Sequence, residues 1–398
     1  MATVMTGVLG KEDVLAGKEV RDVSKGLAYK YQSLNPVVAL MAQMPKGRTA
    51  YNPKVEWTRK DHLPRWDEIS AVTTASGTSI VVTPTNVSYF KVGDVVQIPQ
   101  LSPAATETDI GVVTAKTTTI TVSAIGFQSN GTTTQASFPT VTAGMNLHII
   151  ADASEEYSQR ATMKVVQDVQ EWNYVHFIRC SFAVGNILHD QQNYTGPERE
   201  ERRQETHRDI RIQMEEAVIH GERYYRDGTN GRQFFSRGFR RFIQQGGGEN
   251  ILDWSAGLSE AQWDEFLLKG PCAAGIGSEK ARFGYFSNEL YLKILEIGKA
   301  KERIVGQVDM MGQNFTKYLA PGGITLYMKV HHLFTEDYEG AGLIIDPTRA
   351  RLRPYGNQGV LQYHKDIQEN DRAGVADEWR IIYSLEVDRI EPHAWIHA

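Results

Sequence analysis

An eighty-residue stretch in the first half of the chain differs sharply in composition from the segments on either side. Residues 71–150 contain 24 serines and threonines but only five charged residues, whereas the whole 398-residue chain is 23% charged. Short runs such as "TSIVVTP" and "TTITVSAIGF" alternate apolar with polar residues and are separated by turn residues. Such runs indicate β-strands, because β-branched side chains pack well on a half-buried pleated surface. We therefore predict an inserted all-β domain, a sandwich or a barrel, over residues 71–150; a low-complexity linker is the alternative.

The segments on either side of this stretch predict a loop that leaves and returns. Residues 51–70 are polar and aromatic, and Pro53 and Pro64 exclude a central strand because proline donates no ladder hydrogen bond. Residues 151–170 resume a charged, alternating sequence. We therefore expect an extended loop, 51–70 outward and 151–170 back, that carries the β domain on a two-stranded excursion.

The first fifty residues contain little that could form a core, apart from one apolar helical segment. Within "SLNPVVALMAQMPKG", Pro36 suits the first turn of a helix and Pro45 suits its end. We predict an N-terminal arm over residues 1–50. Its helix is either a short core helix of its own subunit or an apolar plug that docks on another subunit.

A long charged helix is predicted over residues 197–226. Pro197 fixes φ in the first turn, the acidic residues behind it complement the helix dipole, and Gly228 with Asn230-Gly231 provides the stop. The apolar residues form one stripe in the C-terminal half: Ile210, Met214, Ala217, Val218 and Tyr225. The N-terminal half offers ion pairs along its own surface: Glu198–Arg202, Glu200–Arg203 and Arg202–Glu205. This half is either an ordinary solvated surface or a rod whose charged faces meet identical neighbours.

The second half of the chain mixes helical and strand patterns. Two helices are predicted within "LSEAQWDEFLLKG", capped by Ser259, and "SNELYLKILEIGKAKER", capped by Ser287. A strand is predicted in "ITLYMKVHHLF", and further strands close the chain after residue 336. With the inserted β domain, these elements give an α+β fold class.

The composition argues against several functional classes. The net charge of −5 and the pI of about 6.2 do not suit a general nucleic-acid binder, which needs a concentrated basic face. Only Cys180 and Cys272 are present, so neither a disulfide framework nor a structural zinc site is expected. No apolar run approaches the roughly 18 residues that span a bilayer, so no membrane partner is expected.

Sequence motifs for catalysis are also missing. No pattern of a nucleotide-binding loop, a zinc protease or a serine hydrolase occurs. His331 and His332 would point to opposite faces of a strand and could not hold one metal ion. We therefore predict no enzyme activity, no cofactor and no metal.

The order of these segments resembles the major capsid proteins of tailed bacteriophages with the Hong Kong 97-type (HK97-like) fold. The resemblance covers the whole chain at the level of architecture, and locally it is strongest to SU10-type major head proteins, which carry a β insertion. It is carried by "SYFKVGDVVQIP" and "TAGMNLHIIADASEEYS" around the insert, the helix from Pro197 to Gly228, "GTNGRQFFSRGFRRFI" after it and "GLIIDPTRARLRP" near the end.

The resemblance implies a division of the chain that uses the names of that family. The implied parts are an N-terminal arm (1–50), an extended loop (51–70 and 151–170), the insert (71–150), a peripheral domain (171–228 and 336–398) with a spine helix (197–226), and an axial domain (229–335). In that family the arm and the extended loop reach onto adjacent subunits. No covalent crosslink is predicted, because no local motif identifies a partner for Lys54 or Lys60.

The resemblance also implies a function and partners. It implies a structural protein whose copies assemble as hexameric and pentameric capsomers into an icosahedral shell. That shell would enclose packaged double-stranded DNA without sequence-specific binding. Portal, scaffolding and decoration proteins are the further implied partners. The implied location is the virion, after assembly in the host cytoplasm.

In such a shell, the extended loop and the charged helix are the elements expected to touch neighbouring subunits. The candidate inter-subunit contacts are aromatic and charged residues of these two segments: Trp57, Arg59, Lys60, Trp66, Arg199, Arg202, Arg203, Glu205 and Arg208. Three other functions stay open on the residues alone. They are an encapsulin-type nanocompartment shell, a phage tail or adhesin protein with residues 71–150 as a receptor-binding module, and a hydrolase with a β accessory domain.

Overall fold

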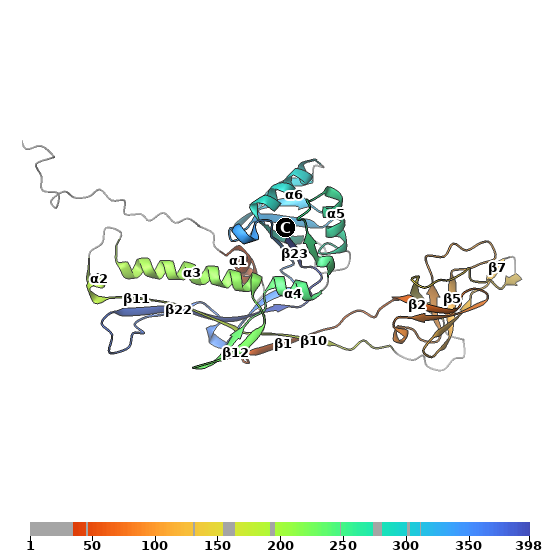
Figure 1. Ribbon diagram of the computed structural model, residues 1–398, viewed down its shortest axis with the longest axis horizontal. Helices are drawn as coiled ribbons and strands as arrows, with labels where there is room; N and C mark the ends of the chain where they lie inside the picture. Colours follow the sequence, from red (N-terminus) through yellow and green to blue (C-terminus); the bar gives the residue numbers. More distant parts are fainter. Residues whose placement is uncertain are drawn as a thin grey trace, which may run out of the picture. The chain divides into compact units, whose positions relative to one another are not determined.

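The computed structural model divides the chain into two compact units, which are described one at a time (Figure 1). The first unit comprises the chain up to Trp57 together with Gln170–Ala398, and the second comprises Thr58–Val169. The structure describes the following residues: 35–44, 47–129, 132–153, 164–191, 196–246, 248–273, 281–300, 303–310 and 312–398. Most of the predicted N-terminal arm therefore lies outside the described residues. The mixed helix and strand content confirms the α+β class.

The second unit is a closed six-stranded barrel. Its strand order is β2-β3-β6-β5-β4-β9, with these bounds: β2 Trp66–Thr74, β3 Ser79–Pro84, β4 Asp94–Gln97, β5 Ile110–Lys116, β6 Ile120–Ala124 and β9 Asn146–Asp152. A short ladder joins β7 (Phe127–Ser129) to β8 (Thr132–Thr134). Alternate residues fill the interior, as Ile80 and Val82 of β3 do, and among the described residues every buried member of this core lies within 69–147. The all-β composition of residues 71–150 therefore corresponds to a barrel with its own core.

The barrel begins earlier in the chain than the composition indicates. Strand β2 starts at Trp66, so residues 66–70, which were expected in the outward part of the loop, belong to the barrel. Strand β1 covers Lys54–Arg59 near the start of that outward part. Pro53 and Pro64 lie outside the strands. The two prolines therefore excluded strand structure at their own positions and not over the whole of 51–70. β1 pairs with β10 (Val169–Tyr174) in a two-stranded sheet, which agrees with a loop that leaves and returns.

In the first unit, the long helix α3 (Glu198–His220) lies along a four-stranded sheet (Figure 1). This sheet has the order β11-β22-β20, with β21 also paired to β22: β11 His176–Val184, β20 Ala350–Pro354, β21 Gln362–His364 and β22 Val375–Val387. Three of the six buried residues of α3, Ile210, Met214 and Val218, belong to its predicted stripe. The Tyr383 hydroxyl of β22 donates to the Met214 carbonyl at 3.3 Å. The apolar half of α3 thus faces the sheet.

The long helix ends six residues before the predicted end. Gly221 follows its last residue, and a Cβ there would lie 2.4 Å from the carbonyl oxygens of Ala217 and Ser236, so this close approach requires glycine. Tyr224–Gly228 (β12) and Gly231–Phe235 (β13) then form a two-stranded hairpin. The prediction of helix over 221–226 is wrong, because the Asn-Gly dipeptide there closes a hairpin turn.

A seven-stranded sheet forms the rest of the first unit. Its order is β14-β23-β19-β15-β18-β17-β16: β14 Ile251–Asp253, β23 Ala394–His397, β19 Gly342–Ile345, β15 Ala281–Phe286, β18 Thr325–Val330, β17 Gln313–Leu319 and β16 Ile304–Met310. The helices of the second half of the chain are α4 Phe239–Gly246, α5 Glu260–Lys269 and α6 Asn288–Ala300. Ser259 caps α5 as predicted, and its side chain forms a capping box with Gln262.

Two further expectations are corrected by the first unit. Strands β19 and β23 belong to the seven-stranded sheet, whereas β20–β22 belong to the four-stranded one, so the closing segment 336–398 feeds both sheets. The expected boundary at residue 335 therefore does not separate the strands of the two sheets, because long-range pairing rather than chain order decides sheet membership. Helix α1 (Pro36–Gln43) packs its buried apolar residues into the core of its own unit. It is a core helix and not a plug for another subunit.

Candidate subunit-contact surface

The charged N-terminal half of α3 makes the ion pairs that its spacing predicts. Arg202 contacts Glu198 Oε1 at 3.0 Å and Glu205 Oε2 at 2.7 Å, and Arg203 contacts Glu200 at 2.9 Å. Such exposed pairs each contribute about 0.2–0.5 kcal/mol to the helix. The side chains of Arg202 and Glu205 remain 50% and 41% exposed, so these two residues stay accessible to another molecule.

Arg199 holds the first turn of α3 against the sheet of its own chain. Its Nε and Nη2 donate to the two carboxylate oxygens of Asp377, both at 2.7 Å, and Nη2 also donates to Asp366 at 2.9 Å. The Tyr363 hydroxyl donates to the same Asp377 carboxylate at 2.5 Å. Burial would raise the pKa of Asp377, but the hydrogen bonds from Arg199 and Tyr363 lower it overall. Arg199 is thus committed to its own subunit.

The other two α3 candidates have different surroundings. The Arg203 guanidinium lies 5.5 Å from the Tyr363 ring centroid, and its backbone carbonyl accepts from Trp379 Nε1 at 3.2 Å. Arg208 is half-buried. The guanidinium of Arg203 therefore supports the β21–β22 region as well as the helix surface.

The four loop candidates do not lie together. Trp57 is buried in the core of the first unit, where its Nε1 donates to the Val387 carbonyl at 3.1 Å. In the second unit, Arg59 is half-buried, and Lys60 lies 3.9 Å from Asp168. Trp66 is 54% exposed and stacks on His148 across the barrel strands, with ring centroids 6.1 Å apart. Only Lys60 and Trp66 have the exposure that a contact with another molecule requires.

A groove that the sequence did not indicate lies beside the β12–β13 hairpin. It has a volume of about 870 Å³, and its walls come from the hairpin, from β11, and from Pro53, Tyr355 and Ile382. The lining is aromatic and basic, and it includes Phe177, Phe234, Arg179, Arg226 and Arg232. The repeated Arg and aromatic residues around Asn230-Gly231 were the available signal, but only the hairpin brings them against β11.

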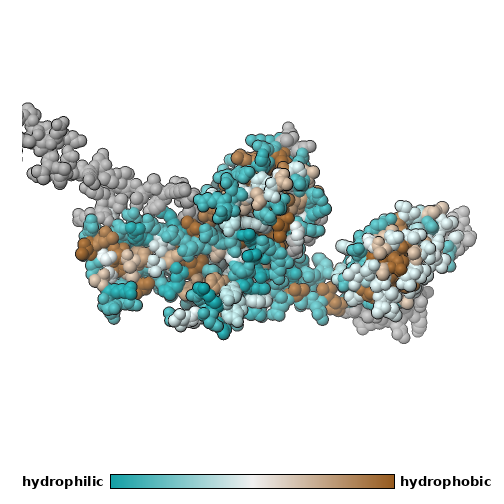
Figure 2. All heavy atoms as spheres, in the orientation of Figure 1, coloured by the Kyte–Doolittle hydropathy of each residue, from teal (hydrophilic) through white to brown (hydrophobic). Residues whose placement is uncertain are grey.

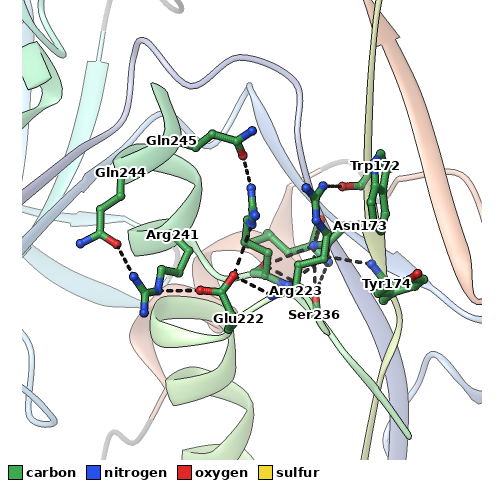
Figure 3. Close-up of polar contacts among 11 residues, drawn as sticks. Trp172, Asn173, Tyr174, Glu222, Arg223, Ser236, Arg241, Gln244 and Gln245 are labelled. Atoms are coloured by element: carbon green, nitrogen blue, oxygen red, sulfur yellow. Dashed lines mark hydrogen bonds and ion pairs between the residues drawn. The ribbon is translucent and has the colours of Figure 1, made fainter. Parts of the chain in front are cut away.

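An arginine cluster occupies the end of α3 (Figure 3). Glu222 Oε2 lies 2.8 Å from Arg241 Nε, and its other oxygen lies 3.8 Å from Arg237 Nε. Arg223 donates to the Trp172 carbonyl at 2.6 Å, and its guanidinium lies 3.8 Å from the centroid of that ring. Burial and the repulsion of Arg223 lower the pKa of Arg237. The Glu222 carboxylate therefore contacts two guanidinium groups at this point, those of Arg237 and Arg241.

Asn173 fixes the end of β10 beside this cluster (Figure 3). Its buried Nδ2 donates to the Ser236 hydroxyl at 3.0 Å and to the Leu385 carbonyl at 2.8 Å. Its Oδ1 accepts from the backbone N–H of Arg237 at 2.8 Å. Because all these partners are buried or half-buried, Asn173 ties β10 to β22 and to the segment after the hairpin.

A buried carboxylate holds the start of α1. Glu215 of α3 accepts from the backbone N–H groups of Val37 at 2.7 Å and Val38 at 2.9 Å, and from His331 Nε2 at 2.9 Å. His331 Nδ1 accepts from the Leu333 N–H at 3.2 Å, so the proton is on Nε2. β18 ends at Val330, so the expectation of a strand through both histidines is wrong.

Neither a metal cluster nor a membrane-spanning helix occurs in the described part of the chain. Among those residues, no group of three or more His, Cys, Asp or Glu side chains could hold a metal ion. Within the same ranges, no helix is long and apolar enough to cross a membrane. The arrangement supplies grooves, charges and exposed aromatic rings, which are the features of surfaces that bind other macromolecules.

Comparison with known proteins gives a family and several distant structural neighbours. The family model described as SU10 major capsid protein matches residues 14–398. The search for similar curated proteins gives no match. Among solved structures, a chain of Mycobacterium phage Bobi is 9% identical with a TM-score of 0.47, and 98% of each chain is covered.

Two further neighbours cover less of the chain. The capsid of Cyanophage P-SCSP1u is 8% identical, covers 63% of this chain and 80% of its own, and has a TM-score of 0.42. The holo-SrpI encapsulin complex of Synechococcus elongatus is 11% identical, covers 58% and 77%, and has a TM-score of 0.40. TM-scores at this level carry no argument, so the assignment depends on the family model. Because that model spans nearly all of the sequence, the chain belongs to the SU10 major capsid protein family.

Proposed function

We propose that this major capsid protein is the repeating unit of an icosahedral, HK97-like tailed-phage head that encloses double-stranded DNA. The observation that carries the proposal is the match of the family model to residues 14–398. A major capsid protein is a structural component of the virion, and this role requires no catalysis. Hexameric and pentameric capsomers, and contacts with portal, scaffolding and decoration proteins, are the finer parts of the proposal.

Exposed aromatic and basic surfaces support self-association. Tyr224 and Tyr225 of the hairpin and Trp66 of the barrel are all exposed. The aromatic and basic groove beside the hairpin has room for side chains of another molecule. Exposed aromatic rings beside arginines are typical of protein interfaces, because they bury a large area at a small cost in side-chain entropy.

The contacts of α3 support a role as a rigid element inside each subunit. Arg199 in its first turn binds Asp377 of the sheet. Glu215 in its second half accepts a hydrogen bond from Val37 at the start of α1. We infer that the helix stiffens the subunit and that Arg202 and Glu205 are its accessible charges. Lys60, and Trp66 of the barrel strand β2, are the exposed candidates of the second unit, and they remain proposed contacts.

Expression of the chain, with electron microscopy and sedimentation of the product, tests the proposal. Closed shells are expected. Solitary monomers, rods or trimers under all assembly conditions would contradict it. Analysis of particles purified from infected cells separates a phage head from a nanocompartment, because a phage head contains double-stranded DNA. Cargo protein in place of DNA would favour the encapsulin-type alternative.

A further inference from the structure

One end of the four-stranded sheet has a large apolar side chain that is not packed into the core. The short helix α2 (Asn186–Asp190) follows β11, and its Ile187 is 89% exposed. No other large apolar side chain of the described residues is as exposed. Leu188 beside it is also exposed, and Figure 2 shows a hydrophobic patch over the end of the first unit where α2 lies in Figure 1. Such a patch is unfavourable in water unless another molecule covers it.

A hollow lies directly beside α2. Its volume is about 530 Å³, and it is lined by the end of β11, the start of β22 and the loop 367–374. Small residues form much of its surface, including Ala183 and Ala376, which are paired across the two strands. Gly185, the residue before α2, also lines it. Small side chains over this area leave a cavity that large apolar side chains can fill.

Each of the two features has an exposed charged side chain, and these two charges are of opposite sign. Asp190, at the end of α2, is largely exposed, and its nearest basic group is the exposed His189 at 3.0 Å. Arg372, on the wall of the hollow, is largely exposed and lies 3.2 Å from the exposed Glu369. Exposed pairs of this kind hold their side chains weakly. Both charges are therefore available to a partner that buries them together.

We propose that α2 of one copy of this chain docks into the hollow of a second copy. Ile187 would lie on the surface formed by Ala183 and Ala376, and Asp190 would approach Arg372. A second copy is the occupant because the apolar side chain, the cavity and both charges belong to one small region of the same chain. Each copy can therefore give and receive the contact. This proposal rests on the proposed function, which places many copies in contact.

Removal of the apolar side chain is the first test. Ile187→Asp should raise the protein concentration needed for assembly at least about ten-fold, because each contact loses a buried isoleucine. Leu292→Asp is the matched control, since Leu292 is 60% exposed on α6, which does not line the hollow. Both variants should keep the wild-type circular dichroism spectrum and melting temperature. Assembly of Ile187→Asp at the wild-type concentration would overturn the proposal.

A charge exchange is the second test. A folding defect could not produce the expected result, which is recovery of assembly in the double variant. Asp190→Arg and Arg372→Asp should each weaken assembly, and the double variant should recover most of it. A double variant no better than the weaker single variant would contradict the Asp190–Arg372 contact.

Failure of this docking is distinguishable from failure of the proposed function. If wild-type protein forms shells and Ile187→Asp forms them equally well, only the docking is wrong. If wild-type protein forms no shells, the proposed function is contradicted. The docking is then judged by sedimentation equilibrium of both proteins, where equal self-association overturns it.

Discussion

The barrel and the first unit obtain their cores in different ways. Every buried core residue that the structure describes in the barrel lies within one continuous segment, from Ile69 to Leu147. The core of the first unit joins α1, α3 and the closing strands, and Glu215 bonds to Val37 across 178 positions of sequence. A continuous segment can fold on local strand pairing, whereas the first unit must close long loops before its contacts form. The two units should therefore respond differently to the same kind of substitution.

The largest expected effect is at the long-range contact of Glu215. Glu215→Ala removes the acceptor of three buried donors, at about 1–3 kcal/mol for each, so the first unit should lose at least about 3 kcal/mol of unfolding free energy. The barrel transition should not change. Urea unfolding followed in both units measures this, and Glu216→Ala is the control because Glu216 is exposed on the same helix. An equal loss in both units would show that they do not fold separately.

The next effect concerns the tether at the start of α3. Arg199→Ala removes two charge-assisted hydrogen bonds to buried Asp377, and we expect a loss of about 2–3 kcal/mol in the first unit. The folded pKa of Asp377 lies below its ordinary value of 3.8, so its ionised form stabilises the fold above that pH. This stabilisation is lost as the pH falls below 3.8 through the folded pKa.

The pH dependence separates this tether from a simple packing effect. Urea unfolding at about pH 6 and about pH 3 should show a smaller difference for Arg199→Ala than for the wild type. Asp377→Asn should remove the same part of the difference. If both variants keep the wild-type pH dependence, Asp377 does not carry the stabilisation assigned to it.

A smaller effect is expected inside the barrel. Ile120 is fully buried there, and Ile120→Val should cost about 0.5–1.5 kcal/mol, in the barrel transition alone. The same loss should appear in residues 58–169 expressed alone, because their core is complete without the first unit. Thermal unfolding of the excised segment gives the measurement. A segment that does not fold alone would remove the contrast between the two units.

The same contrast explains what the sequence could predict. Local patterns predicted the β nature of 71–150 and the helix cap at Ser259, because both depend on neighbours a few residues apart. Sequence alone could not predict the Glu215 contact with α1, since no local pattern links residues 178 positions apart. The hairpin at Asn230-Gly231 had a local signal, but the same residues also suit a helix stop. In the structure these residues form a hairpin, and the backbone of Gly221 before it lies close to Ser236 after it.

The candidate inter-subunit contacts also differ in whether local sequence could predict their surroundings. Exposure cannot be predicted for one residue of a polar segment, because it depends on what packs against that residue. Trp57 is therefore a core residue of the first unit, whereas Trp66 lies exposed on the barrel. On α3, spacing alone predicted the pairs of Arg202, but the tether of Arg199 depends on a strand far away in sequence.

The smallest stability effect, at Arg202, gives the sharpest test of what α3 does in a shell. Arg202→Ala should cost only a few tenths of a kcal/mol, because its pairs with Glu198 and Glu205 are exposed. If α3 is only an internal rigid element, assembly should follow this small loss. If its charged face also meets neighbouring copies, Arg202→Glu should block assembly while the melting temperature stays near that of Arg202→Ala. Light scattering of assembling subunits, compared with their thermal unfolding, decides between the two. If Arg202→Glu lowers assembly only as much as it lowers stability, α3 has a purely intramolecular role. A charge reversal that acts only through folding cannot reduce assembly more than it reduces stability.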